Sequence, residues 1–553
     1  MQNLVSQTLE SELVSSEDKK YIKSLDQKTL SELFDPNYKF KFGTAGIRLP
    51  LGVGTRQLNI FTYTQLILGY IYYLQTIPPK NNRHHKVVLG RDNRYLSREV
   101  MMFAAQIFTS FGFEVFVPQD YEMLATPIVS YLINELDLDG GIMFTASHNP
   151  KTDNGFKVYN NVGAQPTTDV TNVIETYIPS YKDVMLFDFE ADEELISFID
   201  EHEITAYYDL IKENLINTNK NSEKQFQTVL TTHHGAASYN MQPFLESLGY
   251  EIISVHEQNF ENPDFINDES SNPEDQISFT KALTYTNEHN ATVMIGIDPD
   301  ADRMGVAIQH DNEWYYLSGD QTGVLYAYYL LHYKNYERPK YIISTIVSNT
   351  YVERIAKDFD TTVHYVGVGF KHHGNLIAQL RKDQDLVVAF EEAIGTNLID
   401  MNNDKDGYQS AAFILELIAF YQNQGLSLID VFTKLIFPKY GYWYAHTYPF
   451  VFKNKDWKQD AQALLTKLQT TDLKQIIDLN LLKIEYNQEH NYITWFLDND
   501  STIKFRLSGT EPKFKIYVNL IEDQYQSNEF WYTHFANKAD AIVAMLREYL
   551  QLP

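Results

Sequence analysis

The chain has 553 residues, a formal net charge of −28 and no cysteine. This length exceeds the size at which one hydrophobic core keeps growing, so we expect several domains. The acidic balance argues against a general affinity for nucleic acid or for an anionic membrane, and the lack of cysteine excludes disulfides and thiolate metal sites. The opening segment MQNLVSQTLESELVSSEDKK does not resemble a signal peptide, and no run approaches the roughly 18 apolar residues of a membrane span. We therefore expect a cytoplasmic enzyme.

The first part of the chain predicts alternating helices and strands. Apolar residues at helical spacing between Tyr63 and Leu74 predict a helix, and the run VVL that follows predicts a buried strand. We expect a second helix with Ser97 as its N-cap and a third with Thr126 as its N-cap and Pro127 in its first turn. The segments FEVFV and GGIMFTAS predict further strands. This succession is typical of a largely parallel sheet covered by helices.

The same alternation recurs from Phe226 to Ile297 and again from Tyr341 to Phe390. The last hundred or so residues differ, because YITWFLD, TIKFRLS and FKIYVNL predict strands without intervening helices, followed by a long helix from Trp531 to Leu550. The expected fold is therefore α/β, with three related α/β domains containing mixed sheets and a smaller C-terminal α+β domain. The expected domains are residues 1–205, 206–325, 326–440 and 441–553.

The segment IDPDADRMG predicts a metal site. Asp298, Asp300 and Asp302 follow an apolar strand at every second position, so an extended backbone would turn the three carboxylates to one side. Carboxylates that close repel one another unless a cation holds them, and oxygen ligands suit Mg²⁺, Mn²⁺ or Ca²⁺ rather than Zn²⁺. An EF-hand loop is excluded, because Arg303 and Gln309 stand where it requires Gly and Glu. A solvated acidic turn is the remaining alternative.

Two further segments offer groups suited to phosphate chemistry. The turn RLSGTEPKFKIY brings together a guanidinium, hydroxyls, a glycine and an ammonium, which are groups that can wrap a phosphate, although an ordinary turn is the alternative. Ser147, in FTASHNP, lies at the end of a strand. A neighbouring histidine does not supply the geometry of a hydrolase triad, and no G-x-S-x-G elbow is present. A serine that carries a phosphoryl group beside Mg²⁺ is the reading that links this motif to the aspartates.

Several motifs together resemble the α-D-phosphohexomutase superfamily of phosphoglucomutases and phosphomannomutases. In chain order they are KFGTAGIR, GRDNR, TASHNP, NGFK, DPDADR, FEEAIG, DKDG and RLSGTEPKFKIY. They span nearly the whole chain, and the forms FGTAGIR and EEAIG are most similar to the longer phosphoglucomutase/phosphopentomutase branch. The resemblance implies four domains around a central cleft, each of which supplies one loop.

The resemblance also implies residue roles. Ser147 would be the phosphoserine, and one of its phosphate oxygens would join Asp298, Asp300 and Asp302 around Mg²⁺. Glu391 would grip the sugar hydroxyls and Arg303 would face the metal loop. The substrate's other phosphate would meet the loop that holds Arg506, Ser508, Gly509, Thr510 and Lys513.

The reaction centre would be lined by Arg48, His148 and Lys157. A general base must also take the proton of the sugar hydroxyl. Lys371 in GVGFKHHG is our candidate, because it matches a loop lysine in similar enzymes and because a lysine amid other cations can have a lowered pKa. His148 and His372 are the rival candidates.

The expected function is a Mg²⁺-dependent mutase that moves a phosphoryl group between C1 and C6 of glucose, with glucose 1,6-bisphosphate as intermediate. Phosphopentomutase, phosphomannomutase and glucose 1,6-bisphosphate synthase are the enzymatic alternatives, and a non-catalytic phosphosugar-binding protein is the alternative of another class. Ala393 stands where many sugar-binding loops of these enzymes carry serine, which leaves the choice between hexose and pentose open. The expected partner is a small-molecule phosphosugar, and the sequence is compatible with a monomer or a homodimer.

Two features lie outside these motifs. The pairs His84-His85 and His233-His234 have no carboxylate or cysteine partners at metal-ligand spacing, so structural or surface roles are expected for them. The segment NPDFINDESSNPEDQ predicts a polar loop.

Overall fold

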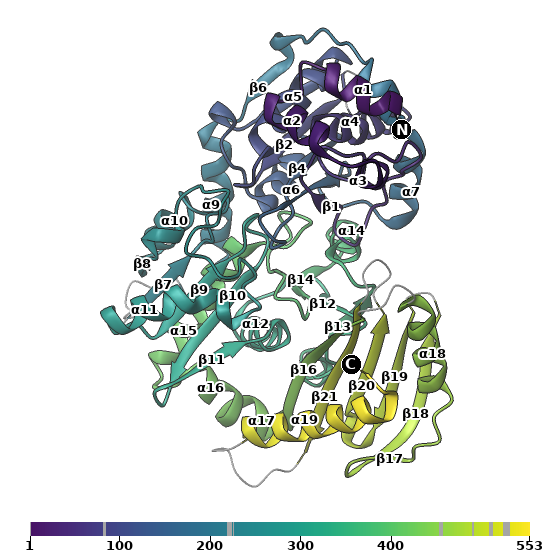
Figure 1. Cartoon of the computed structure of the whole chain (residues 1–553). Coiled ribbons are helices and arrows are strands. Elements are labelled where there is room, and N and C mark those ends of the chain that lie inside the picture. The colour runs from purple at the N-terminus through teal and green to yellow at the C-terminus, as the bar shows by residue number, and fades with distance from the viewer. Residues whose placement is uncertain are drawn as a thin grey trace.

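Four sheets follow one another along the chain. The computed structural model describes residues 2–80, 84–217, 224, 226–452, 457–488, 491–507, 513–523 and 531–552. Figure 1 shows the N-terminal unit at the top, the second unit at the left and the C-terminal sheet at the lower right, with the third unit between them. The predicted α/β class, with three α/β units and a smaller C-terminal unit, is confirmed. None of the helices in the described ranges is long and apolar enough to cross a membrane.

The first sheet is mixed. In spatial order its strands are β1 (Ile47–Pro50), β5 (Asp153–Tyr159), β4 (Gly140–Phe144), β2 (Lys86–Arg91), β3 (Glu114–Val117) and β6 (Ile196–Phe198). Strands β4, β2, β3 and β6 run parallel, whereas β5 and β1 are antiparallel to their neighbours. The helices are α1 (Gln2–Glu10), α2 (Ser16–Ser24), α3 (Gln27–Leu33), α4 (Ile60–Leu74), α5 (Ser97–Ser110), α6 (Thr126–Glu135), α7 (Thr168–Tyr177) and α8 (Tyr181–Met185).

The two predicted N-caps are each wrong by one residue. Helix α5 starts at Ser97 after Leu96, and α6 starts at Thr126 after Ala125; neither preceding residue makes a side-chain cap. The hydroxyls have other partners: Ser97 Oγ donates to Asp92 Oδ1 at 3.3 Å, and Thr126 Oγ1 donates to Asp300 Oδ2 at 2.7 Å. Both hydroxyls therefore stabilise loops rather than helix ends.

The second and third units repeat the α/β pattern. The second sheet has the order β11 (Glu313–Leu317), β10 (Met304–His310), β9 (Val293–Ile297), β7 (Gln227–Thr231) and β8 (Glu251–Ser254), with helices α9 (Glu201–Asn214), α10 (Met241–Ser247) and α11 (Thr280–His289). The third sheet has the order β13 (Thr361–Val366), β12 (Lys340–Thr345), β14 (Asp385–Phe390) and β15 (Thr396–Asn397). Its helices are α12 (Gly319–Tyr333), α13 (Val352–Asp358), α14 (Phe370–Leu380), α15 (Gly407–Gln422), α16 (Leu428–Asp430) and α17 (Phe437–Tyr440).

The fourth sheet is antiparallel throughout. Its strands in spatial order are β16 (Tyr442–Val451), β21 (Lys513–Glu522), β20 (Thr502–Leu507), β19 (Tyr492–Leu497), β18 (Leu479–Asn487) and β17 (Gln475–Ile476). Helices α18 (Trp457–Gln469) and α19 (Trp531–Leu550) accompany it. The three predicted strands, which are β19, β20 and β21, and the terminal helix are confirmed, whereas β16, β17, β18 and α18 were not predicted.

The ends of three strands determine where the site lies. Strand β4 leads to Ser147, β9 leads to Asp298 and β14 leads to Glu391. All residues of β4 and β9 are buried, so these strands are fixed by packing while the loops after them are free to carry polar side chains. Loops at the carboxyl ends of parallel strands are where α/β folds build ligand sites.

Candidate active site

Ser147 lies against the aspartate loop of the second unit. Its side chain is almost fully buried, and its Oγ donates a hydrogen bond to Asp298 Oδ2 at 2.8 Å. The backbone of Ser147 is left-handed, with φ of 50°, and its N–H donates to Thr145 Oγ1 at 2.7 Å. The structure thus brings the predicted phosphoserine and a predicted metal ligand into direct contact.

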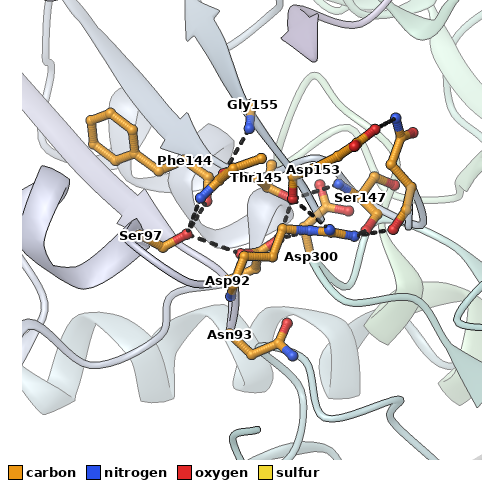
Figure 2. Close-up of polar contacts among 12 residues, drawn as sticks. Asp92, Asn93, Ser97, Phe144, Thr145, Ser147, Asp153, Gly155 and Asp300 are labelled. Carbon is orange, nitrogen blue, oxygen red and sulfur yellow. Dashed lines mark hydrogen bonds and ion pairs between the residues drawn. The ribbon is translucent and has the colours of Figure 1, made fainter. Parts of the chain in front are cut away.

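A buried Asp-Arg pair supports the serine loop (Figure 2). Asp92 Oδ2 accepts from Thr145 Oγ1 at 2.6 Å, and the Arg94 guanidinium donates to Asp92 Oδ2 at 3.2 Å. Arg94 also donates to the backbone carbonyl oxygens of Ser147, Asn149, Pro150 and Asp153. Asp92 and Arg94 belong to the motif GRDNR, for which sequence reasoning gave no role. Hydrogen bonds between loops this far apart in the chain leave no local pattern in the sequence.

The three aspartates converge as predicted, but on a turn. Residues 298–302 form a turn after β9, with φ of 59° at Ala301, so the extended backbone expected from the alternating spacing is wrong. Carboxylate oxygens of Asp298, Asp300 and Asp302 nevertheless lie within 4.8 Å of one another, and all three side chains are buried. The turn is held by the Arg303 N–H, which donates to Asp298 Oδ1 at 2.9 Å.

Two buried lysines neutralise part of this charge. Lys157, from β5, donates to Asp300 Oδ2 and to Asp302 Oδ2, the latter at 3.0 Å. Lys405, in the motif DKDG, lies 3.1 Å from Asp302 Oδ2 and 3.6 Å from Asp404 Oδ1. Sequence reasoning quoted this motif and missed Lys405, although a lysine between two aspartates in a matching motif was the available signal.

The cations decide the ionisation of the cluster. Burial would raise the pKa of Asp302, but Lys157, Lys405 and Arg303 outweigh it and lower that pKa. The pKa of Asp300 is likewise lowered, because Lys157 outweighs burial and the Asp302 charge. For Asp298, burial and the two neighbouring carboxylates raise the pKa well above its ordinary value. Two carboxylates are therefore strongly anionic, whereas at Asp298 burial and the neighbouring carboxylates outweigh the charge of Arg303.

The donor set fits a hard divalent cation. Asp300 Oδ1 and Asp302 Oδ1 are buried without a hydrogen-bond partner, which is costly for carboxylate oxygens unless a cation binds them. Oxygen-only ligands of this kind suit Mg²⁺. The three aspartates would hold the ion, and it would lie next to Ser147 Oγ.

Arg48 and His148 lie beside the serine. Arg48, on β1, donates through Nη1 to Asn149 Oδ1 at 3.1 Å. Burial, followed by the charges of Arg303 and Arg48, lowers the pKa of His148 well below its ordinary value. His148 therefore carries a neutral ring, and its Nδ1 is buried without a hydrogen-bond partner.

The sugar-binding and phosphate-binding predictions fall on two neighbouring units. Glu391 lies at the end of β14 with Oε1 3.9 Å from Arg303 Nη2, and burial raises its pKa to about 7. Arg506, on β20, lies opposite Lys515 in the register of the antiparallel pair of β20 and β21. Lys513 begins β21, whereas Ser508, Gly509 and Thr510 lie outside the described residues.

The structure does not bring Lys371 to the aspartates. Its Nζ donates to Thr168 Oγ1 on α7 at 3.1 Å, and within the described ranges no ion pair links it to Asp298, Asp300 or Asp302. Burial lowers the pKa of Lys371. Its assignment as the general base stays a prediction.

Comparison with known proteins identifies the family to which the sequence and the fold are similar. Three models described as phosphoglucomutase/phosphomannomutase alpha/beta/alpha domains I, II and III match residues 39–185, 205–312 and 318–436. A phosphomannomutase of Mycoplasmoides pirum is 36% identical over 94% of this chain and 95% of its own length, and a phosphoglucomutase of Staphylococcus haemolyticus is 32% identical over 88% and 91%. The fold is similar to that of parafusin, a phosphoglucomutase of Paramecium, with a TM-score of 0.69 and 19% identity over 92% of this chain and 97% of that one.

The Lys405 contact generates a first prediction. Lys405→Met should lower the free energy of unfolding in the absence of metal by roughly 2 kcal/mol, less than the roughly 3–5 kcal/mol of a fully broken buried pair, because Lys157 and Arg303 remain beside Asp302. Added Mg²⁺ should then raise the melting temperature of this variant more than that of the wild type, since the ion binds only the folded state. Thermal unfolding with and without Mg²⁺ measures both effects.

The control for this experiment is Lys434→Met, which removes a largely exposed lysine paired with Asp430. It should leave both melting temperatures nearly unchanged. Equal Mg²⁺ shifts in Lys405→Met and the wild type would contradict the assignment of the aspartates as the cation site.

Proposed function

Because the chain belongs to the phosphoglucomutase/phosphomannomutase family, we propose that it interconverts the 1- and 6-phosphates of glucose through a phosphorylated Ser147. The family makes the protein an isomerase-type phosphotransferase. The observation that supports the residue assignment is the buried hydrogen bond from Ser147 Oγ to Asp298, at the edge of a cluster of three aspartates. A hydroxyl in that place is next to both a cation site and the positive charges needed around a phosphoryl group.

The proposed reaction has two transfers. The phosphoryl group on Ser147 passes to the free hydroxyl of a sugar monophosphate: the Oγ–P bond breaks, a sugar O–P bond forms, the hydroxyl proton passes to the general base, and the departing Ser147 Oγ takes up a proton. The glucose 1,6-bisphosphate so formed reverses its orientation in the site. Its other phosphoryl group then returns to Ser147. Mg²⁺ held by the three aspartates and a phosphoserine oxygen would supply charge neutralisation for the phosphoryl oxygens.

Arg48, Lys157 and Arg303 supply the remaining positive charge. Lys157 is fixed by two carboxylates, and Arg303 Nε lies 3.7 Å from Asp302 Oδ1. Because Lys157 is buried, Arg303 is only 12% exposed and both are already positioned, they need little reorganisation when charge develops on the phosphoryl oxygens.

Lys371 remains our candidate for the general base. A base at neutral pH needs a lowered lysine pKa, and carboxylate partners work against this. Asp300 and Asp302 outweigh burial and raise the pKa of Lys157, and the corresponding pKa of Lys405 is also raised. Burial lowers the pKa of Lys371, whose hydrogen bond goes to a hydroxyl. His148 has its pKa lowered so far that its ring would hold a proton poorly.

A phosphomannomutase is the second candidate, because the Mycoplasmoides pirum relative carries that name at 36% identity. The two hexoses differ at one hydroxyl, so the choice depends on how the loop around Glu391 meets the sugar. The test is to measure kcat/KM for glucose 1-phosphate, mannose 1-phosphate and ribose 1-phosphate side by side, with Mg²⁺ and a trace of the matching bisphosphate. We expect the highest value for glucose 1-phosphate; a higher value for mannose 1-phosphate would overturn that preference.

Ser147→Ala tests the phosphoryl carrier. The variant should lose mutase activity by at least about 10³-fold, because no group replaces the lost acceptor, while still binding glucose 6-phosphate. Coupled turnover assays and calorimetric titration measure the two properties. Ser31→Ala, which changes an exposed serine on α3, is the control and should behave as the wild type. Undiminished turnover by Ser147→Ala would refute the phosphoserine assignment.

From the ionisation of Glu391 we predict a step in the dependence of kcat/KM on pH. Its pKa of about 7 means that it is protonated below neutral pH and ionised above, and the carboxylate is the better acceptor for sugar hydroxyls. We therefore expect kcat/KM to rise as the pH passes upward through about 7, and Glu391→Gln to lose this step. The ionisation of the substrate phosphate is common to both proteins, so superimposable profiles would contradict the role of Glu391.

A further inference from the structure

A long segment of the second unit, without helix or strand, contacts the first unit. Residues 259–274, here called the strap, come after β8 and contain all but the last two residues of the segment that predicted only a polar loop. None of the sequence motifs lies in the strap. Its contacts nevertheless reach both the serine loop and the aspartate turn.

The strap contacts the first unit at the motif GRDNR and the tyrosine after it. Glu261 forms an ion pair with Arg91 at 2.5 Å, and Tyr95 Oη donates to Asp264 Oδ2 at 2.9 Å. In addition, the guanidinium of Arg94 lies over the ring of Phe265, 5.2 Å from its centroid. Phe265 is buried, so this cation–π contact is shielded from water.

Arg94 is the residue that holds the serine loop. Its guanidinium donates to the carbonyl oxygens of Ser147 and Asn149 and to Asp92. The guanidinium carbon lies over the ring of Phe265, while its N–H groups make these hydrogen bonds. A shift of Phe265 therefore reaches Ser147 through one side chain.

His234 closes the strap on itself. Its Nδ1 lies 2.9 Å from the carbonyl oxygen of Phe260, and its Nε2 lies 2.7 Å from that of Ile266. The ring also makes edge contacts with Phe260 and Phe265, so Phe265 is in contact with both His234 and Arg94.

The strap also supports the aspartate turn. Asp268 Oδ2 lies 2.9 Å from His233 Nδ1, with both side chains buried. Two residues after His233, Gly235 packs so closely on Pro299 that a Cβ there would lie 2.3 Å from the proline Cα, and the next N–H donates to Pro299 O at 2.7 Å. Near the end of the strap, Glu274 Oε2 lies 4.0 Å from Arg303 Nη1.

The backbone of this region is unusual. His233, His234, Phe265 and Asn267 have φ of 46°, 62°, 49° and 60°, in the left-handed region that bulky residues seldom adopt. Such conformations persist where the surroundings impose them, and they concentrate at functional sites. Among them, Phe265 contacts Arg94 and His233 contacts Asp268 of the strap.

We propose that the strap is a positioning element that keeps Ser147 in register with the aspartate turn. Phe265 acts through Arg94 on the serine loop, and Asp268 acts through His233 and Gly235 on Pro299. This inference rests on the proposed function in assigning the phosphoryl group to Ser147. Phe265 is a positioning residue that touches no reacting atom.

The test compares Phe265→Leu with Phe265→Tyr. Leucine keeps an apolar side chain but removes the aromatic face under Arg94, whereas tyrosine keeps the face. We expect Phe265→Leu to lower kcat by about fivefold to tenfold with KM within about twofold, and Phe265→Tyr to retain wild-type kcat. Glu269→Gln, at an exposed strap residue, is the matched control.

A second readout does not depend on turnover. Amide hydrogen exchange of residues 144–153 should be faster in Phe265→Leu than in the wild type and in Glu269→Gln, because the serine loop loses part of its support. Glu261→Gln, which breaks the contact with Arg91, should show a smaller increase at the same residues and stands in if Phe265→Leu does not fold.

Three results separate the possible failures. Wild-type kcat and wild-type exchange in Phe265→Leu would overturn the positioning role of the strap. An equal loss in Phe265→Tyr would overturn the cation–π contact as its cause. A wild-type protein without turnover and without phosphate on Ser147 would refute the proposed function, while the exchange experiment would still decide whether the strap supports the serine loop.

Discussion

Three buried carboxylates within 4.8 Å of one another are the constraint on which the rest of the site depends. Charges this close repel strongly at the low effective dielectric of a protein interior, so the arrangement exists only if cations surround it. The chain meets this need from several places. Lys157 comes from a strand of the first unit, Lys405 from a loop of the third and Arg303 from the end of the aspartate turn itself. The electrostatics of one turn therefore fix how three units face one another.

The scaffold and the chemistry are divided between strands and loops. Buried parallel strands determine where β4, β9 and β14 end, and the polar side chains follow those ends. The loops are then held by a contact between units, the donation from Thr126 Oγ1 to Asp300, and by packing within the second unit, where Gly235 lies close against Pro299. In the C-terminal unit, Lys504 of β20 donates to the carbonyl oxygen of Ser348, which ties the strand that carries Arg506 to the third unit. Excluding water from such a site would favour transfer of a phosphoryl group over its hydrolysis.

Sequence reasoning could reach the features that have a local signature. Alternating apolar segments predicted the α/β units, and closely spaced aspartates predicted a cluster, although the backbone beneath it is a turn rather than a strand. It failed where a contact spans the fold. The hydroxyls of Ser97 and Thr126 looked like helix caps and instead bind Asp92 and Asp300, and the support of Ser147 by Arg94 joins residues 53 positions apart. Such pairings follow from tertiary packing, which no local pattern encodes.

The most direct test of this account is to locate the phosphoryl group. The protein would be incubated with glucose 1,6-bisphosphate and Mg²⁺, quenched in acid, and digested for tandem mass spectrometry of the peptide that contains residues 144–153. The account predicts one phosphoryl group on Ser147, which disappears when excess glucose 6-phosphate is added before the quench. A phosphoryl group on another residue, or one on Ser147 that glucose 6-phosphate does not remove, would contradict the claim that Ser147 carries the transferred group.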